Sequence, residues 1–320
     1  MNNMNKSKKN HNNIKSKPKY LEYPYYYYIY KPNKQKCYML AKKINNKIDK
    51  LPSGHKVIID DWRKNNEINQ LTDIFTEKCR VKCVFLDNPS PLEYWTKKIK
   101  YNPSNSIEYY RELIYKNTKL CNNFRISLVI TILKMFNATR WLDISAGWGD
   151  RLLGAILSQQ IEYYCGVDPN QCVQEGYKSI LEFFFKDKPQ EKDKYNLIQD
   201  GFETAKLPNN KTYDLVFSSP PFFDLETYSD EQSNSLISYN TEDKWLNGFL
   251  LPSIVKSCSV LDSKGHIVLY ITESKNTKYI SKMIEQTKIL APELKYKGKM
   301  YYKDSGKKGN LRDFHIWQKK

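Results

Sequence analysis

Little in this sequence suits a membrane-embedded or secreted protein. It has no apolar run of the ~18–20 residues that a transmembrane helix needs, and no secretory signal is recognisable in it. Its seven cysteines are odd in number and irregularly spaced, which disfavours a disulfide framework and favours a reducing compartment. We therefore expect an intracellular protein, in the cytoplasm of a producing or host cell or in a virion, with no membrane partner.

Metal-ligating residues are also sparse. The four histidines are scattered, at positions 11, 55, 266 and 315. Cys79 and Cys83 are the one close pair of cysteines, but no second Cys or His pair stands nearby, and the sequence RVKCVFL around Cys83 predicts a strand. We expect no metal site.

Acidic residues are scarce at both ends of the chain. Residues 1–50 carry 13 lysines and 2 acids, residues 295–320 carry 9 basic and 2 acidic residues, and the whole chain has a formal charge of +17. Basic ends around a nearly neutral middle suit a polyanion, because each lysine–phosphate contact releases counterions. Solvated tails are the alternative. It stays open for residues 1–20, whereas we favour a binding role for residues 295–320.

Glycines are few, but two stand in one short turn. An apolar run over residues 140–143 predicts a buried strand, the turn Ser145-Ala146-Gly147-Trp148-Gly149 follows, and Asp150 is expected to cap a helix. A second strand over residues 163–167 ends at Asp168. These elements make a βαβ unit. Its glycines allow the backbone close to a ligand, and its terminal acid can accept hydrogen bonds from ribose hydroxyls.

Asp143 stands at the end of the first strand. It distinguishes this pattern from the dinucleotide-binding fingerprint, which has a third glycine and binds a pyrophosphate. The pattern D-x-x-x-G-x-G resembles motif I of class I S-adenosylmethionine (SAM) methyltransferases, and an Asp suits a ligand with a positive amino-acid end. The resemblance implies SAM as cofactor, bound by Asp143, Ser145, Gly147, Trp148, Gly149 and Asp168. A plain βαβ turn with incidental glycines is the alternative.

A second motif begins 70 residues after Gly149. The apolar sequence YDLVFS over residues 213–218 predicts a strand, and Ser219-Pro220-Pro221-Phe222 follows it directly. This tetrapeptide resembles the [DNS]-PP-[YFW] motif of amino-methyltransferases, which act on exocyclic amines of adenine or cytosine. Its chemistry explains the residues. A polar side chain and a carbonyl held by two prolines accept the hydrogens of a planar amine, and the aromatic ring stacks on a base that has left its helix. The resemblance implies that Ser219, Pro220, Pro221 and Phe222 are catalytic.

The stretches 143–155 and 218–235 look like phage- and large-virus-type DNA methylases, and the resemblance covers roughly residues 100–320. It implies an α/β, class I (Rossmann-like) methyltransferase fold with a seven-stranded mixed sheet, closed by a hairpin over Lys295–Tyr302 and Phe314–Trp317. Asp200-Gly201-Phe202 resembles motif III, in which Asp200 would bind the adenine amine of SAM and Phe202 would flank its ring. Leu120–Arg125 lies where motif X approaches the cofactor.

Three regions are expected: a disordered basic tail over residues 1–20, an accessory α/β region over residues 21–100 and the SAM-dependent methyltransferase domain over residues 101–320. The accessory region is a possible nucleic-acid-binding or target-recognition module. Its tyrosine-rich stretch Leu21–Tyr30 is expected to pack on the domain as a strand, although tyrosines beside lysines can also stack bases.

These features together predict SAM-dependent methylation of an exocyclic amine in DNA. Adenine N6 is favoured and cytosine N4 follows, since Ser at position 219 is frequent in cytosine-N4 enzymes. An RNA methyltransferase and a nucleic-acid-binding protein with an inactive methyltransferase fold are the alternatives. The recognition sequence and the oligomeric state are left open.

Overall fold

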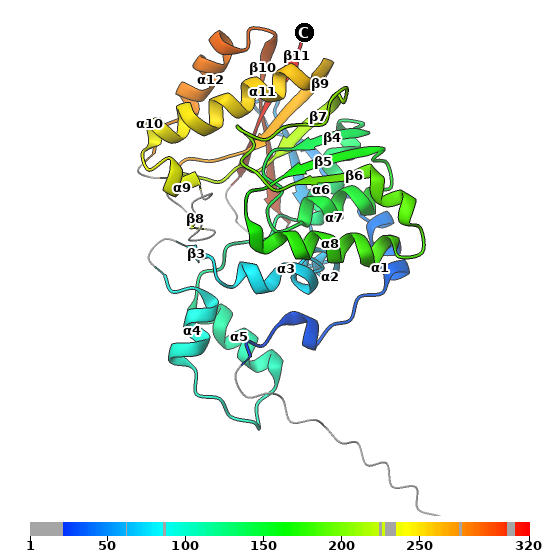
Figure 1. Ribbon diagram of the computed structural model, residues 1–320, viewed down its shortest axis with the longest axis vertical. Helices are drawn as coiled ribbons and strands as arrows, with labels where there is room; N and C mark the ends of the chain where they lie inside the picture. Colours follow the sequence, from blue (N-terminus) through cyan, green and yellow to red (C-terminus); the bar gives the residue numbers. More distant parts are fainter. Residues whose placement is uncertain are drawn as a thin grey trace, which may run out of the picture.

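The computed structural model describes residues 22–61, 63–85, 88–223, 226–227, 235–274, 277–305 and 311–320. The expected tail over residues 1–20 lies outside the described residues. Helices cover both faces of one long sheet, and a pair of helices, α4 and α5, lies beyond one end of this body (Figure 1). None of the helices in the described ranges is long and apolar enough to cross a membrane.

The main sheet has nine strands. Their spatial order is β1 (Lys47–Lys50), β2 (Lys56–Asp60), β10 (Leu294–Asp304), β11 (Arg312–Lys319), β9 (Leu261–Tyr270), β7 (Tyr213–Ser218), β4 (Arg140–Asp143), β5 (Tyr163–Val167) and β6 (Tyr195–Ile198). The strands from β9 to β6 are parallel, and β11 is antiparallel to both β9 and β10. The expected α/β class and the closing antiparallel hairpin are confirmed.

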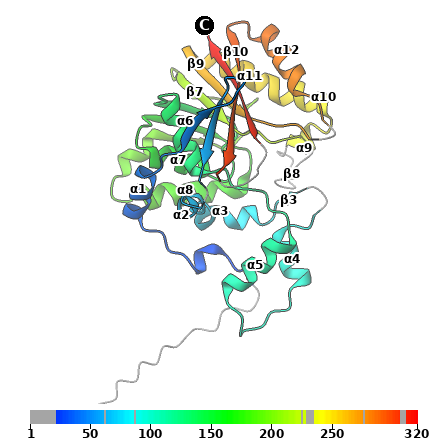
Figure 2. The ribbon, with the colours of Figure 1, turned by 180° about the vertical axis from the view of Figure 1, so that it is seen from behind.

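The expected count of seven strands is too low by two. β2 pairs in parallel with β10, at Val57 opposite Tyr301, and β1 pairs antiparallel with β2. Figure 2 shows these two blue strands beside the red β10, on the far edge of the sheet from β6. Part of the accessory region therefore belongs to the same sheet as the predicted methyltransferase domain.

The helices follow the chain as α1 (Lys34–Lys42), α2 (Asn66–Asn69), α3 (Asp73–Arg80), α4 (Pro91–Lys98), α5 (Ile107–Asn117), α6 (Ile126–Met135), α7 (Asp150–Ser158), α8 (Gln171–Phe185), α9 (Ser235–Ser238), α10 (Glu242–Trp245), α11 (Leu251–Val260) and α12 (Ile280–Leu290). Short 3₁₀ helices span η1 (Tyr26–Tyr28) and η2 (Pro189–Lys194), a π-helix spans η3 (Leu246–Leu250), and a small ribbon pairs β3 (Val84–Phe85) with β8 (Glu226–Thr227).

Strand alternation distributes the core over both faces of the sheet. On β7, Leu215 and Phe217 lie in the core shared with α6, α7 and α8, whereas Val216 between them lies in the core shared with α11 and α12. Successive side chains of a strand point to opposite faces, so a continuous apolar strand must be buried on both sides. The parallel strands therefore lie inside the molecule, and their carboxyl ends face one edge.

Two local expectations in the accessory region need correction. The strand expected around Cys83 forms only over Val84–Phe85, as β3; the residues before it end α3 in a turn, because Arg80 is buried and its Nη2 pairs with the Asp73 carboxylate of the same helix at 2.7 Å. The tyrosine stretch forms the 3₁₀ turn η1 rather than a strand, since its backbone bonds to the buried side chains of Glu77 and Arg111 instead of to a sheet.

Candidate active site

The glycine turn has a backbone that favours glycine at two positions. Gly147 has φ +64° and Gly149 has φ +95°, both in the left-handed region. A Cβ on Gly149 would also lie 3.0 Å from Cδ1 of Ile180 on α8. Gly149, rather than the expected Asp150, occupies the N-cap position, and Asp150 is the first helical residue. The turn therefore brings backbone close to the carboxyl ends of β4 and β5.

Asp143 is fully buried, and four donors surround its carboxylate. Its Oδ2 accepts from Arg151 Nε at 2.8 Å and from the Tyr164 hydroxyl at 3.0 Å. Its Oδ1 accepts from Ser218 Oγ at 2.7 Å and from the Ser145 N–H at 3.4 Å. These bonds join β4 to β5, β7 and α7, so Asp143 organises the site from beneath and does not lie on the cavity wall.

Asp168 ends β5 and touches the glycine turn directly. One carboxylate oxygen accepts the Gly147 N–H at 2.7 Å and the other accepts the Asn170 N–H at 3.0 Å. Desolvation raises the pKa of Asp168 to about 6, and the two backbone N–H groups oppose this rise. The ionised carboxylate keeps lone pairs toward the cavity, where it can accept further hydrogen bonds.

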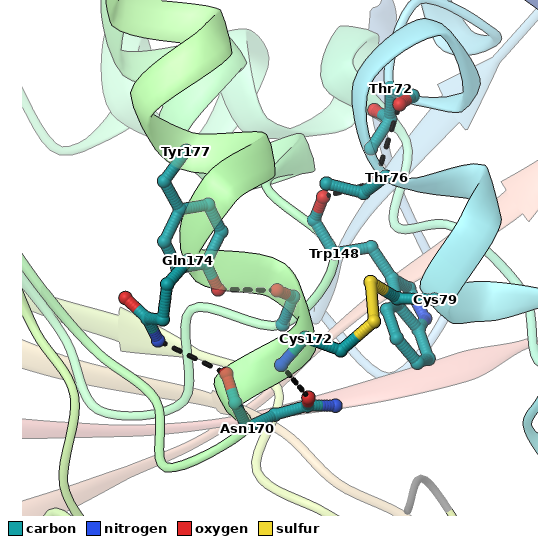
Figure 3. The surroundings of a disulfide bond; sticks show 9 residues. Thr72, Thr76, Cys79, Trp148, Asn170, Cys172, Gln174 and Tyr177 are labelled. Carbon is teal, nitrogen blue, oxygen red and sulfur yellow. Dashed lines mark hydrogen bonds between the residues drawn. A yellow bond between two sulfur atoms is a disulfide. The ribbon is translucent and has the colours of Figure 1, made fainter.

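Helix α3 supports the turn from behind. Thr76 Oγ1 donates to the Trp148 carbonyl at 2.7 Å, and the Cys79–Cys172 disulfide joins α3 to the first turn of α8 (Figure 3). A second disulfide joins Cys83 to Cys121. The expectation against disulfides is therefore wrong: the partners stand 93 and 38 residues apart in sequence, a distance over which spacing patterns give no signal.

The second motif begins at the carboxyl end of β7. Ser219 lies on the cavity wall, Pro220 is buried, and Pro221 and Phe222 return to the wall. The Phe222 ring meets the Tyr270 ring edge-on, with 5.7 Å between centroids. Tyr270 ends β9, so two neighbouring parallel strands each place an aromatic ring at this edge.

One cavity of about 620 Å³ collects most of the expected site residues. Its lining includes Ser145, Gly147, Trp148, Asp168, Phe202, Ser219, Pro221 and Phe222. Asp143, Gly149, Asp200 and Pro220 lie outside this lining. A volume of this size suits a nucleoside-sized ligand with room beside it for a second group.

The acid that faces the cavity after β6 is Glu203. Asp200 Oδ1 accepts from the Gly201 N–H at 2.8 Å and from Thr204 Oγ1 at 3.0 Å, and so caps its own turn. Glu203 lines the cavity beside Phe202; its Oε1 accepts from the Tyr239 hydroxyl at 2.9 Å. Its buried Oε2 has no hydrogen-bond partner among the described residues.

The cavity wall holds further residues, of which only those before α6 were expected. The cavity is also lined by Asn122, Asn123, Phe124, Arg125, Arg151, Asn170, Tyr270 and Thr272. The first four fall in the stretch expected near the cofactor before α6. The sequence could have indicated Tyr270 as a wall residue, because it ends an apolar strand. Nothing in the sequence distinguishes Arg151 from an ordinary helical residue. The polar stretch that follows the second motif also predicts a lid over the target base, with Asp224, Glu226 and Tyr228 near the site. Asp224, Tyr228 and the side chain of Glu226 lie outside the described residues.

No protein-family model matches this chain, and no curated protein matches its sequence. Solved structures resemble its fold. TrmN from Thermus thermophilus aligns with 62% of this chain, at 11% identity and a TM-score of 0.42. The alignment covers 49% of TrmN, so this chain spans about half the length of that protein. A putative rRNA methylase from Clostridium thermocellum aligns with 61% of this chain and 97% of its own, at 12% identity and a TM-score of 0.41. A methyltransferase from Pyrococcus furiosus aligns with 70% of this chain and 91% of its own, at 13% identity and a TM-score of 0.39.

At these TM-scores the likeness supports no argument about this chain, and its fold class follows from its own strand order. The protein has a Rossmann-like α/β fold, in which an antiparallel hairpin continues the parallel strands β9 to β6 and two additional strands lie at one edge. Its cavity lies outside the carboxyl ends of the parallel strands, the place where open α/β sheets bind their ligands.

Proposed function

We propose that this protein is a SAM-dependent methyltransferase that modifies an exocyclic amine of a nucleobase in DNA. One observation carries the proposal: the Ser219–Phe222 motif lines the same cavity as the Ser145–Trp148 turn and Asp168. A plain Pro-Pro loop has no reason to share a cavity with a glycine turn and an acid placed to bind a ribose. Adenine N6 is the favoured target and cytosine N4 the second, because a serine opens the motif.

The residues present fit SAM. Asp168 would accept the ribose hydroxyls, and Glu203, through its unpartnered Oε2, would accept the adenine amine in place of the expected Asp200. Phe202 would flank the adenine ring. Arg151 lines the cavity with its charge partly balanced by Asp143, which leaves a guanidinium N–H donor for the carboxylate of the methionine part. When bound, SAM supplies a methyl group on a positively charged sulfur.

The chain's own residues act on the target amine. Ser219 Oγ and the neighbouring backbone carbonyl accept hydrogens from the amine, which frees its lone pair as the nitrogen becomes tetrahedral. Phe222 stacks on the base, and Tyr270 supports that ring from its edge. Bound SAM would supply the methyl group to this nitrogen, and one N–H proton of the methylated amine would leave to solvent. Hydrogen-bond acceptors suffice, so no titrating base is assigned.

The test combines labelled SAM with DNA or RNA, followed by digestion to nucleosides and identification of the methylated one. Label in N6-methyl-2′-deoxyadenosine from DNA is the expected result. Label in a cytosine product, or in RNA, would reassign the substrate within the same chemistry. Phe222→Ala should leave SAM affinity intact and cut methyl transfer severely, because a base–aromatic stack is worth ~1–3 kcal/mol.

The matched control is the next residue. Phe223 packs on Trp245, 6.0 Å between centroids, and is not part of the cavity lining. Phe223→Ala should therefore keep most of the activity. Full activity in Phe222→Ala would show that the target base binds elsewhere. SAM binding without transfer to any nucleic acid would support the inactive nucleic-acid-binding alternative.

A further inference from the structure

The tyrosine-rich segment before α1 is fixed to the protein through its backbone and its first ring. Tyr23 is 1% exposed. Arg111 Nη1 donates to the Pro24 carbonyl at 2.8 Å, and the Tyr26 N–H donates to the Glu77 carboxylate at 2.5 Å. The Tyr30 hydroxyl also donates to Glu67 at 2.8 Å, so these contacts hold both ends of the segment in place.

Those rings form an accessible aromatic surface, here called the tyrosine platform: Tyr25, Tyr27 and Tyr28. Tyr25 and Tyr27 stack with 5.3 Å between ring centroids and an interplanar angle of 11°. Tyr28 is 42% exposed, and its ring centroid lies 4.4 Å from that of Tyr27. An ordered cluster of rings left in contact with water is typical of a binding surface.

Two exposed lysines lie over the platform. Lys78 Nζ of α3 lies 5.7 Å from the Tyr25 centroid and 5.4 Å from the Tyr27 centroid, and Lys31 Nζ lies 5.9 Å from the Tyr27 centroid. Within the described residues neither ammonium forms an ion pair. Glu22 is the carboxylate that meets the platform, where it accepts from the Tyr28 hydroxyl. The two lysines therefore keep their charge for a ligand.

The platform and the cavity lie on opposite sides of α3. Thr76 faces the cavity turn through its bond to Trp148, and Lys78, two residues later, points about 200° away around the helix. Helix α3, about 10–12 Å across with its side chains, therefore lies between the platform and the cavity turn. Beyond the end of α3, Phe85 lines the cavity, and Lys119 Nζ lies 6.0 Å from the centroid of the Phe85 ring. Lysine–aromatic contacts therefore occur both at the platform and at the cavity.

We propose that the tyrosine platform stacks unpaired nucleotides that flank the methylated base. Stacked rings beside free ammonium groups are the chemistry that binds single-stranded nucleic acid: rings take the bases and lysines take the phosphates. The chain that precedes the platform adds to this charge, since residues 1–20 contain six lysines and no acid. The inference rests on the proposed function for its choice of ligand.

The test uses the full chain and fluorescent strands of about 12 nucleotides, within the length that one binding domain covers. Oligo-dT, oligo-rU and a DNA duplex are titrated separately, and SAM affinity reports on the cavity. Tyr27→Ala should weaken single-strand binding roughly 5- to 100-fold, whereas Tyr27→Phe should keep it. Lys78→Gln should reduce the slope of log affinity against log salt by about 0.7.

Matched controls lie away from the platform. Tyr109, 48% exposed on α5, and Lys178 on α8 should tolerate Tyr109→Ala and Lys178→Gln without change in strand affinity. Equal affinities of Tyr27→Ala and wild type for both single strands would overturn the proposal and leave a protein partner for this surface. Binding confined to the duplex would overturn it as well.

If Tyr27→Ala weakens binding of oligo-dT, the ligand is DNA; if it weakens binding of oligo-rU, the ligand is RNA. The two proposals also fail separately. Normal methyl transfer with unchanged strand binding in Tyr27→Ala refutes the platform alone. Weakened strand binding without methyl transfer by the wild type refutes the proposed function and leaves the platform standing.

Discussion

Asp168 allows a pH test of the cofactor site. Burial raises the pKa of this carboxyl to about 6, and its two oxygens already accept the Gly147 and Asn170 N–H groups. Ribose hydroxyls donate to the ionised form, so SAM binding favours that form. The affinity should therefore be full above the pKa and fall as the pH drops through it. A protonated carboxyl would present its own O–H to a site filled with donors.

The size of the effect follows from the same numbers. With a pKa of about 6, only about a tenth of Asp168 is ionised one unit lower, so the SAM dissociation constant should rise about tenfold between roughly pH 7.5 and pH 5. Asp168→Asn replaces an acceptor oxygen by a donor NH₂ group. It should cost ~1–3 kcal/mol of binding, about 5- to 150-fold, at neutral pH. The affinity of this variant should no longer vary with pH in that range.

Isothermal titration calorimetry with SAM across this pH range measures both effects, and circular dichroism verifies the fold at each pH. Asp200→Asn is the matched control, because Asp200 begins the turn after the neighbouring strand and its side chain bonds to Gly201 and Thr204 instead of lining the cavity. It should keep the pH profile of the wild type. An unchanged dissociation constant in Asp168→Asn, or a pH slope that survives in it, would refute the assignment.

Three further predictions concern support of the site. Burial raises the pKa of Asp150 to about 7, so the folded protein holds a proton that the unfolded chain releases; stability should fall by up to about 4 kcal/mol as the pH rises from about 4 to 7, and denaturant unfolding of Asp150→Asn should not show this fall. Cys83→Ser should remove up to about 4 kcal/mol of stability, since the bond to Cys121 closes a span of 38 residues; a wild-type melting temperature insensitive to reductant would contradict this. Glu203→Ala should weaken SAM binding about fivefold or more by calorimetry, whereas Tyr239→Phe, which removes the same internal hydrogen bond, should not.

The elements with strong local patterns could be predicted from the sequence. The apolar positions of Gln171–Phe185 follow one helical face, and α8 has those bounds. The strand, glycine turn, helix and strand around the first motif also occur where expected, because each depends on residues close in sequence. The sequence over Thr241–Ser259 likewise predicts a helix, and the structure has α10 and α11 there, joined by the π-helix η3, for which the apolar pattern gives no sign.

Long-range pairing could not be predicted in this way. β2 pairs with β10, which lies more than two hundred residues later in the chain. The sequence around Val57 predicts a strand but gives no information about the strand with which it pairs. The cysteine partners are equally remote. Cys79 and Cys83 are close in sequence and were considered together, yet each bonds to a cysteine from a different element. Only the tertiary fold brings Cys172 and Cys121 to α3.

The acids of the site show why residue type and spacing are not enough. Asp143, Asp200 and Glu203 all stand near strand ends, and motif spacing favoured the first two as ligands. Hydrogen-bond capacity distinguishes them: Asp143 is satisfied by four internal donors, Asp200 caps its own turn, and Glu203 alone of the three keeps a buried oxygen without a partner among the described residues. A buried acceptor left open costs free energy unless a ligand fills it. For this reason we propose Glu203, and not Asp200, as the acid that contacts the cofactor.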